Sequence, residues 1–238
     1  VTIPDERFEQ ILNFLDRYNF TVSEDTPLDI EVAVDAEMLG NVYESLVNIS
    51  EDEDRRGDAG IFYTPRAEVD LMCRLSLVNY LCANLGQQHR ELFYQWLFAF
   101  SSEQKNVAAQ GIADRQLEKP LEECLQNLTV LDPACGSGAF LVGMLTVVDE
   151  LTQRLDRQKN RKSTAYQRRK QIIGQSLYGV DVKEWACHVA ELRLWLALII
   201  DSQFSADELA IRKDPLLPNF TFNIRCGDSL VQEVGGLD

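Results

Sequence analysis

The second half of the chain alternates short β-type runs with longer helical stretches, and this alternation constrains the fold more than any other feature. The runs cover residues 128–132, 177–181 and 220–228, and each ends in an aspartate. Apolar helical sequence at residues 139–155 and 184–201 separates them. The pattern is typical of a parallel sheet with helical crossovers. Because such crossovers are right-handed, we expect the strands side by side in the order third, second, first.

The three aspartates that end these runs are expected to meet in one crevice, because ligands of such sheets bind beyond the carboxyl ends of the strands. A carboxylate at Asp132, beside a helix N-terminus, suits a cationic group. Asp181 has the position from which an acidic side chain accepts hydrogen bonds from ribose hydroxyls, and Asp228 is placed to meet the edge of an adenine ring. A single aspartate after a strand is more often a turn or cap residue, so the prediction depends on all three together.

The loop after the first run contains Gly136 and Gly138. These glycines remove side chains where a backbone must approach a ligand, and they leave amide groups at a helix N-terminus. The loop lacks the dinucleotide fingerprint, because Leu141 stands where the third glycine would be, and it is not a P-loop, because no lysine follows. With Asp132 in front of it, the loop favours a zwitterionic amino-acid ligand over a pyrophosphate.

The formal net charge of −15 over 238 residues argues against binding of the DNA phosphate backbone by this chain alone. A local exception is the basic stretch at residues 154–170, which is basic enough to touch phosphate. A solvated helical face is the ordinary alternative for such a run.

The sequence indicates neither a membrane segment nor a metal site. No apolar run approaches the roughly 20 residues that a membrane span requires, and the N-terminus lacks the pattern of a secretory signal. We therefore expect a cytoplasmic protein. The six cysteines are scattered and form no CxxC pair, and only two histidines are present, so we expect reduced thiols and no metal.

The first half of the chain has a helical pattern. We divide the sequence into a helical N-terminal region at residues 1–120 and a partial ligand-binding domain at residues 121–238. Apolar residues recur at helical spacing in residues 8–15 and again after Asp35. Residues 51–60 are polar and lack periodicity, which predicts a mobile loop.

A further helix is expected to start at Thr64 and Pro65, with Thr64 as its cap and Pro65 in its first turn. Glu68 would lie near the positive end of the helix dipole. Residues 92–100 predict an aromatic-rich helix in the core. The helix after Pro65 should be largely buried, through Val69, Met72, Cys73, Tyr80 and Leu81.

Residues 132–141, Asp-Pro-Ala-Cys-Gly-Ser-Gly-Ala-Phe-Leu, resemble the first motif of the amino-group DNA methyltransferases. Residues 60–65 resemble the preceding motif of these enzymes, which folds over the methionine end of the cofactor. Residues 178–195 and 226–230 resemble the two segments that follow. The N-terminal helices, through residues 26–40, look like the segment ahead of this motif in large type II restriction-modification polypeptides.

The resemblance implies a Rossmann-like class I methyltransferase sheet, of which the chain holds the first strands. It implies S-adenosylmethionine as the cofactor and methylation of adenine N6 in DNA within a restriction-modification system. Double-stranded DNA would be contacted mostly by regions outside this chain, and an endonuclease would be fused or associated. The implied cofactor-binding residues are Tyr63, Thr64, Pro65, Asp132, Ala134, Cys135, Gly136, Ser137, Gly138, Phe140, Asp181, Val182, Asp228 and Ser229.

One departure from the family pattern limits this expectation. The family's reaction depends on a later Asn/Asp-Pro-Pro-Tyr/Phe motif that holds a flipped base, whereas Asp132-Pro133 and Asp214-Pro215 lack the second proline and the aromatic residue. We therefore expect an excised fragment that binds cofactor weakly, transfers nothing and contains no catalytic residue. Its first strand would be a sheet edge, which predicts an oligomer or cover by the N-terminal helices. A methyltransferase acting on protein glutamine or RNA, and a non-catalytic scaffold, remain the alternatives.

Overall fold

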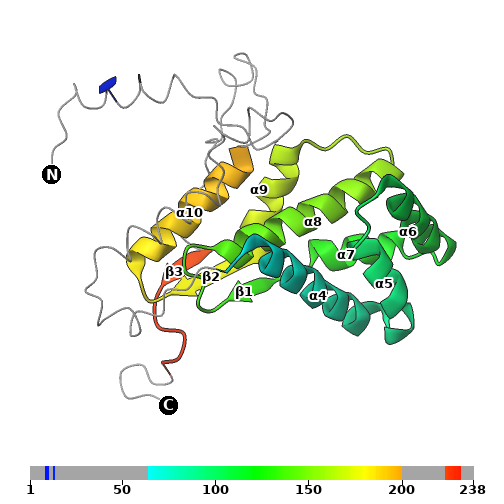
Figure 1. Ribbon diagram of the computed structural model, residues 1–238, viewed down its shortest axis with the longest axis horizontal. Coiled ribbons are helices and arrows are strands. Elements are labelled where there is room, and N and C mark those ends of the chain that lie inside the picture. Colours follow the sequence, from blue (N-terminus) through cyan, green and yellow to red (C-terminus); the bar gives the residue numbers. More distant parts are fainter. Residues whose placement is uncertain (1–8, 11–12, 14–63, 200–222, 232–238) are drawn as a thin grey trace.

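The computed structural model describes residues 9, 10, 13, 64–199 and 223–231. Most of the predicted helix at residues 8–15, the helix after Asp35, the polar loop and Tyr63 lie outside these ranges. The described elements, shown in Figure 1, are α4 (Arg66–Leu85), η2 (Gln87–His89), α5 (Arg90–Leu97), α6 (Ser102–Asp114), α7 (Glu118–Gln126), β1 (Val130–Asp132), α8 (Ala139–Gln158), α9 (Ala165–Ser176), β2 (Leu177–Asp181), α10 (Glu184–Ile199) and β3 (Ile224–Cys226).

The three strands form one parallel sheet in the order β1-β2-β3. Val130 pairs with Leu177 across the first two strands, and Gly179 pairs with Ile224 across the second and third. This confirms the predicted parallel pairing and the predicted strand order. The predicted start of the third run at Phe220 lies outside the described residues. The chain is thus an α/β protein in which a small parallel sheet is combined with a larger number of helices.

One face of the sheet is covered by helices. Leu177 and Gly179 are buried on β2, which is in contact with α8, α9 and α10. A Cβ at Gly179 would lie 2.8 Å from Cδ1 of Leu141, so α8 approaches the strand closely. The opposite face carries Leu131, which pairs in register with Tyr178 and is 62% exposed. Within the described ranges β1 has a strand on one side only, which agrees with the predicted edge position.

Helix α4 packs along α8 and joins the helical region to the sheet. A Cβ at Gly143 would lie 2.4 Å from Cγ1 of Val69, so the two helices are in close contact. One continuous apolar core extends from Val69 in α4 to Ile224 in β3. The predicted burial of Met72 is wrong, because α4 covers α8 with only one of its sides and leaves Met72 52% exposed. The division of the chain at residue 120 stays a prediction.

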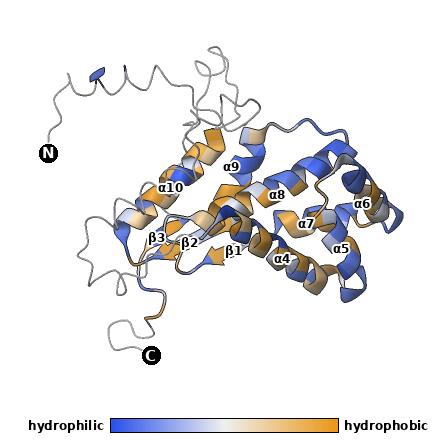
Figure 2. Ribbon diagram, in the orientation of Figure 1, coloured by the Kyte–Doolittle hydropathy of each residue, from blue (hydrophilic) through white to orange (hydrophobic). Residues whose placement is uncertain are grey.

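Helix α5 has the predicted aromatic packing but ends earlier than predicted. Phe93 and Trp96 are buried in the core. The helix ends at Leu97, so Phe100, which was expected inside it, is 63% exposed. Figure 2 shows that the next helix, α6, is largely hydrophilic, which is why no apolar stripe marked it in the sequence.

Two arginines from other helices bind the carboxyl end of α5. Arg74 of α4 donates to the carbonyl of Leu97, and Arg154 of α8 donates to the carbonyl of Trp96 at 2.6 Å. Positive charge at this end of a helix is favoured by the helix dipole. Glu150 of α8 forms ion pairs with both arginines. The carboxyl end of α5 is therefore attached to α4 and α8 through charged groups.

Most cations of the basic stretch at residues 154–170 are engaged in internal ion pairs. Two carboxylates, Glu122 of α7 and Asp149 of α8, each pair with two of them, and Asp149 is only 7% exposed. These pairs connect α7, α8 and α9, so the basic stretch contributes to the packing of these helices, and of the four paired cations Arg161 is the most exposed. The pairs are those of Lys159 and Arg161 with Glu122, and of Arg168 and Arg169 with Asp149. Among the helices of the described ranges, none is long and apolar enough to cross a bilayer.

Candidate functional site

The loop between β1 and α8 depends on two glycines in the left-handed region. Gly136 has φ +52° and Gly138 has φ +82°. Residues other than glycine rarely adopt these backbone conformations. Gly138 also precedes the first residue of α8, Ala139, and a Cβ there would lie 2.9 Å from Cβ of Ala190 in α10. At Gly136, by contrast, a Cβ would meet nothing within 4 Å. The loop is thus packed on one side by α10 and open at Gly136.

The carboxylate of Asp181, at the end of β2, connects this loop to the start of α10. Its Oδ2 accepts a hydrogen bond of 2.8 Å from the amide of Gly136, and its Oδ1 accepts one of 2.9 Å from the amide of Lys183. The amide of Cys135 donates to the carbonyl of Val180 at 2.9 Å. Because each carboxylate oxygen has two lone pairs, Asp181 retains acceptor capacity for a hydroxyl.

Asp132 ends β1 beside this loop. Its Oδ1 accepts a hydrogen bond of 3.2 Å from the amide of Ala134. Burial raises the pKa of Asp132, the hydrogen bond from Ala134 opposes this, and the negative charge of Asp181 raises the pKa further. The site therefore has a surplus of negative charge, which a cationic group would relieve.

The loop after β3 closes the third side. The amide of Gly227 donates to the carbonyl of Asp181 at 2.9 Å, and Oγ of Ser229 donates to the carbonyl of Pro133 at 2.7 Å. Asp228 is exposed, and its Oδ1 accepts a hydrogen bond from the amide of Leu230 at 2.9 Å. The three strand ends therefore meet, as the aspartate pattern predicted. We call the group formed by residues 132–138, 181, 182, 228 and 229 the strand-end site.

Two predicted site residues of the loop have buried side chains. Cys135 is 5% exposed and Ser137 is 7% exposed, so a ligand would meet their backbone and not their side chains. Val182 is the opposite case, with 61% exposure directly after β2. It offers an apolar surface next to the carboxylate of Asp181.

Phe140 lies in the first turn of α8 and is half-buried. Its carbonyl accepts a long hydrogen bond of 3.8 Å from Sγ of Cys73 in α4. Burial is the main cause that raises the pKa of Cys73 to about 12, and the negative charge of Asp132 contributes to the rise. The first half of α4 is therefore close to the strand-end site, through α8.

The start of α4 differs from the prediction. Thr64 was expected to cap the helix and Pro65 to occupy its first turn, but the helix begins at Arg66 with Pro65 at the cap position and no side-chain capping bond. The reason is the ψ of Pro65, which is 149° and therefore extended. Glu68 does lie in the first turn, as predicted. The role of Thr64 and Pro65 at a cofactor stays a prediction, and Tyr63 lies outside the described residues.

The cysteines near the site are poor nucleophiles. Burial is the main cause that raises the pKa of Cys135 to about 12 and that of Cys187 to about 11. Such thiols stay protonated near neutral pH, and the thiolate is the reactive form. All six cysteines are free thiols. Within the described ranges, no group of three or more histidines, cysteines and carboxylates could hold a metal ion.

Arg193 of α10 is a residue that sequence reasoning did not assign to the site. Its Nη1 donates to the carbonyl and to Oγ of Ser137, at 3.1 and 3.0 Å. The available signal was a single arginine inside the apolar helical run of residues 184–201. Its partner lies 56 positions away in the sequence, so the signal alone could not show what it binds.

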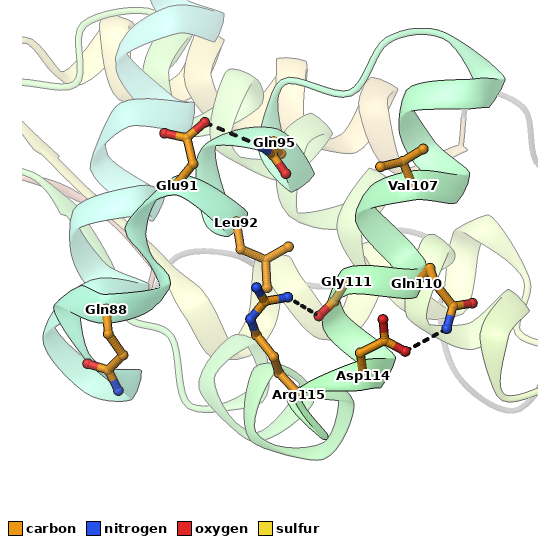
Figure 3. Close-up of a pocket in the computed structure, with 9 residues that line it drawn as sticks. All are labelled: Gln88, Glu91, Leu92, Gln95, Val107, Gln110, Gly111, Asp114 and Arg115. Atoms are coloured by element: carbon orange, nitrogen blue, oxygen red, sulfur yellow. Dashed lines mark hydrogen bonds between the residues drawn. The ribbon is translucent and has the colours of Figure 1, made fainter.

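A pocket of about 460 Å³ lies between α5 and α6, away from the strand ends (Figure 3). Its polar side chains make hydrogen bonds within their own helices and do not converge on its centre. These bonds join Gln95 to Glu91, Gln110 to Asp114, and Arg115 to the carbonyl of Gly111. Since a ligand site needs convergent polar groups, we locate the candidate site at the strand ends.

Comparison with known proteins shows similarity to a curated protein and to a protein family. A protein of Methanocaldococcus jannaschii named "Putative type II restriction enzyme and methyltransferase" is 32% identical over 241 residues, which cover 97% of this chain and 19% of the relative. The chain thus spans about a fifth of the length of this relative. No solved structure matches the chain.

The family comparison covers the strand-end site. Residues 105–233 match the family described as MmeI, DNA-methyltransferase domain. This range contains the glycine loop, all three strands, and Asp132, Asp181 and Asp228. Because the match covers more than half of the 238 residues, the chain belongs to the MmeI DNA-methyltransferase domain family.

Proposed function

We propose that this chain binds S-adenosylmethionine at the strand-end site and forms the cofactor-binding part of a restriction-modification DNA methyltransferase that methylates adenine N6. Its sheet is proposed to be the first part of a Rossmann-like class I fold. The observation that carries the proposal is Asp181, whose carboxylate ends β2 and binds the amide of the left-handed Gly136. An acidic side chain at a strand end beside a glycine loop is the arrangement that holds a nucleoside ribose.

The residues fit the parts of this cofactor. Asp181 would accept hydrogen bonds from the ribose hydroxyls, and Val182 and Asp228 would contact the adenine. The excess negative charge around Asp132 suits a ligand with an ammonium and a sulfonium group. The open space at Gly136 lets a ligand approach the backbone. When bound, the cofactor would supply an electrophilic methyl group.

Other predicted contacts fall on α4 and α8. Phe140 would wall the methionine portion, with Tyr63, Thr64 and Pro65 above it. Target recognition and the base-holding motif are proposed to lie in other parts of the full polypeptide. The formal net charge of −15 supports this, because DNA affinity comes largely from lysine and arginine. An endonuclease, fused or associated, would complete the system.

DNA is favoured over the two alternatives. The matched family is described as a DNA-methyltransferase domain, and the relative is named as a restriction enzyme and methyltransferase. A protein-glutamine or RNA methyltransferase would share the site but not this family. A non-catalytic scaffold would require the full polypeptide to lack the base-holding motif.

Calorimetric titration with S-adenosylmethionine tests the proposal. We expect saturable binding by the chain and an affinity lower by about tenfold or more in Asp181→Ala, because a hydrogen bond to a charged group contributes about 1.5–3 kcal/mol. Asp114→Ala is the matched control, since this carboxylate lies in α6 and bonds Gln110. No heat with the unmodified chain, or equal affinity in the Asp181 variant, would refute the proposed site. In the full polypeptide, N6-methyladenine in DNA is the expected product by nucleoside mass spectrometry.

A further inference from the structure

Arg193 is a buried charged residue that faces the glycine loop from behind. It is 5% exposed and lies on α10. Its Nη1 donates to both the carbonyl and Oγ of Ser137, which is itself 7% exposed. A hydrogen bond from a charged donor to a buried carbonyl is among the stronger ones in proteins.

The bond from Arg193 to the carbonyl of Ser137 is one of two bonds that hold the Ser137–Gly138 peptide group. The carbonyl of Ser137 accepts from Arg193, and the amide of the same peptide group, on Gly138, donates to the carbonyl of Cys135 at 2.8 Å. The peptide group between Cys135 and Gly136 is also held twice, by that same bond and by Asp181. The loop is thus held from one end by Arg193 and from the other by Asp181.

The same face of α10 also limits how closely the glycine loop can approach the helix. Ala190 precedes Arg193 by three positions and therefore lies beside it on the helix. Gly138 approaches Ala190 so closely that a Cβ would lie 2.9 Å from the alanine Cβ. Close contact at Ala190 sets the distance between loop and helix, and the guanidinium sets the rotation of the peptide between Ser137 and Gly138.

We propose that Arg193 is a positioning residue for the cofactor loop. By orienting the Ser137–Gly138 peptide, it determines the direction in which the loop presents its amide groups beside Asp132 and Asp181. Arg193 acts through Ser137 and touches no ligand itself. The consequence for cofactor affinity rests on the proposed function, whereas the effect on loop geometry does not.

Hydrogen–deuterium exchange of the ligand-free chain tests the effect on the loop. In Arg193→Met, which has similar bulk but no donor, we expect amides of residues 134–141 to exchange about tenfold faster, since both charge-assisted hydrogen bonds to Ser137 are lost. Arg193→Lys should restore part of the protection, because an ammonium group can replace one of the two bonds. Ser137→Ala, which keeps the carbonyl, should give a smaller increase in the same amides.

Arg168→Met is the matched control. Its Nη1 likewise donates to the carbonyl and to Oγ of a serine, Ser163, at 2.9 and 3.0 Å, but it does so between α8 and α9. We expect this variant to change exchange near Ser163 and to leave the loop unchanged. It separates the loss of a buried arginine from the loss of the loop contact.

The results discriminate between positioning and general stability. Faster exchange confined to the loop supports the proposal, whereas unchanged loop exchange, or an increase spread evenly over the chain, overturns it. If Arg193→Met does not fold, the lysine and Ser137→Ala variants decide the question by the same criterion. Titration with S-adenosylmethionine is a separate arm, in which we expect about tenfold weaker binding for Arg193→Met and no change for Arg168→Met. Absence of binding by the unmodified chain would refute the proposed function and leave the exchange result standing.

Discussion

At the scale of single residues, Asp132 is the group whose protonation we expect to affect the stability of the fold. Its pKa lies above the ordinary value of 3.8, first because of burial and then because of Asp181. The stability that the protonated carboxyl group contributes is therefore fully present below pH 3.8, the ordinary pKa that applies in the unfolded chain. It is lost as the pH rises through the raised pKa of the folded state. Asp132→Asn removes this loss and keeps an acceptor for the amide of Ala134. We expect its melting temperature near neutral pH to equal or exceed that of the unmodified chain, measured by calorimetry against pH.

The same substitution should weaken ligand binding selectively. The ionised carboxylate attracts a sulfonium cation, and the neutral thioether product lacks that charge. We expect Asp132→Asn to lower the affinity for S-adenosylmethionine more than the affinity for S-adenosylhomocysteine. Equal losses for both ligands, or a lower melting temperature at neutral pH, would contradict this assignment of Asp132.

At the scale of elements, the packing of α4 on α8 depends on Gly143. Gly143→Ala would place a Cβ 2.4 Å from Cγ1 of Val69, a stiff β-branched side chain. Overpacking of this kind costs about 1–3 kcal/mol, which exceeds the roughly 1 kcal/mol by which alanine favours a helix over glycine. We expect a lower free energy of unfolding in urea, and recovery when Val69→Ala is added.

Gly174 in α9 provides the comparison for that experiment. A Cβ at this position would meet nothing within 4 Å. Gly174→Ala should therefore show only the helix-propensity gain and stabilise the chain slightly. If both glycine substitutions behaved alike, the close contact between α4 and α8 would not limit stability.

The elements with a clear apolar pattern could be predicted from the sequence, and those without one could not. The strands, α8 and α10 follow from their apolar runs and from the aspartates that end β1 and β2. Helix α6 went unpredicted because it buries only Ala108 and Ile112. The end of α5 was misplaced because Phe100 is apolar yet exposed, under the guanidinium of Arg74 at 5.2 Å from the ring centre.

In the site, too, the features that follow from the local sequence pattern could be predicted, and the contacts between distant parts of the chain could not. The meeting of the strand-end loops that carry Asp132, Asp181 and Asp228 was predictable, because parallel strands end at one edge of their sheet. The hydrogen bond between Arg193 and Ser137 was not, since it depends on where α10 lies against the loop. A single sequence carries no direct record of such a pairing.

At the scale of the whole molecule, β1 is an edge strand of the sheet within the part of the chain that the structure describes. Leu131 of this strand is 62% exposed, and edge strands promote association with other chains. We expect concentration-dependent self-association in sedimentation velocity, and a smaller association constant for Leu131→Lys. Leu230→Lys is the control, because Leu230 is 85% exposed but lies outside the sheet. A monomer at every concentration would indicate instead that another part of the chain covers the edge.

The bonds that hold the glycine loop join residues that are far apart along the chain. Gly136 and Asp181 are separated by 45 positions, Ser137 and Arg193 by 56, and Pro133 and Ser229 by 96. During synthesis on the ribosome, the loop therefore emerges well before any of these partners does. A nascent chain that ends within α8 has its glycines but none of the groups that shape them. The ligand-binding loop is thus one of the first parts of this site to be made and one of the last to acquire its final form.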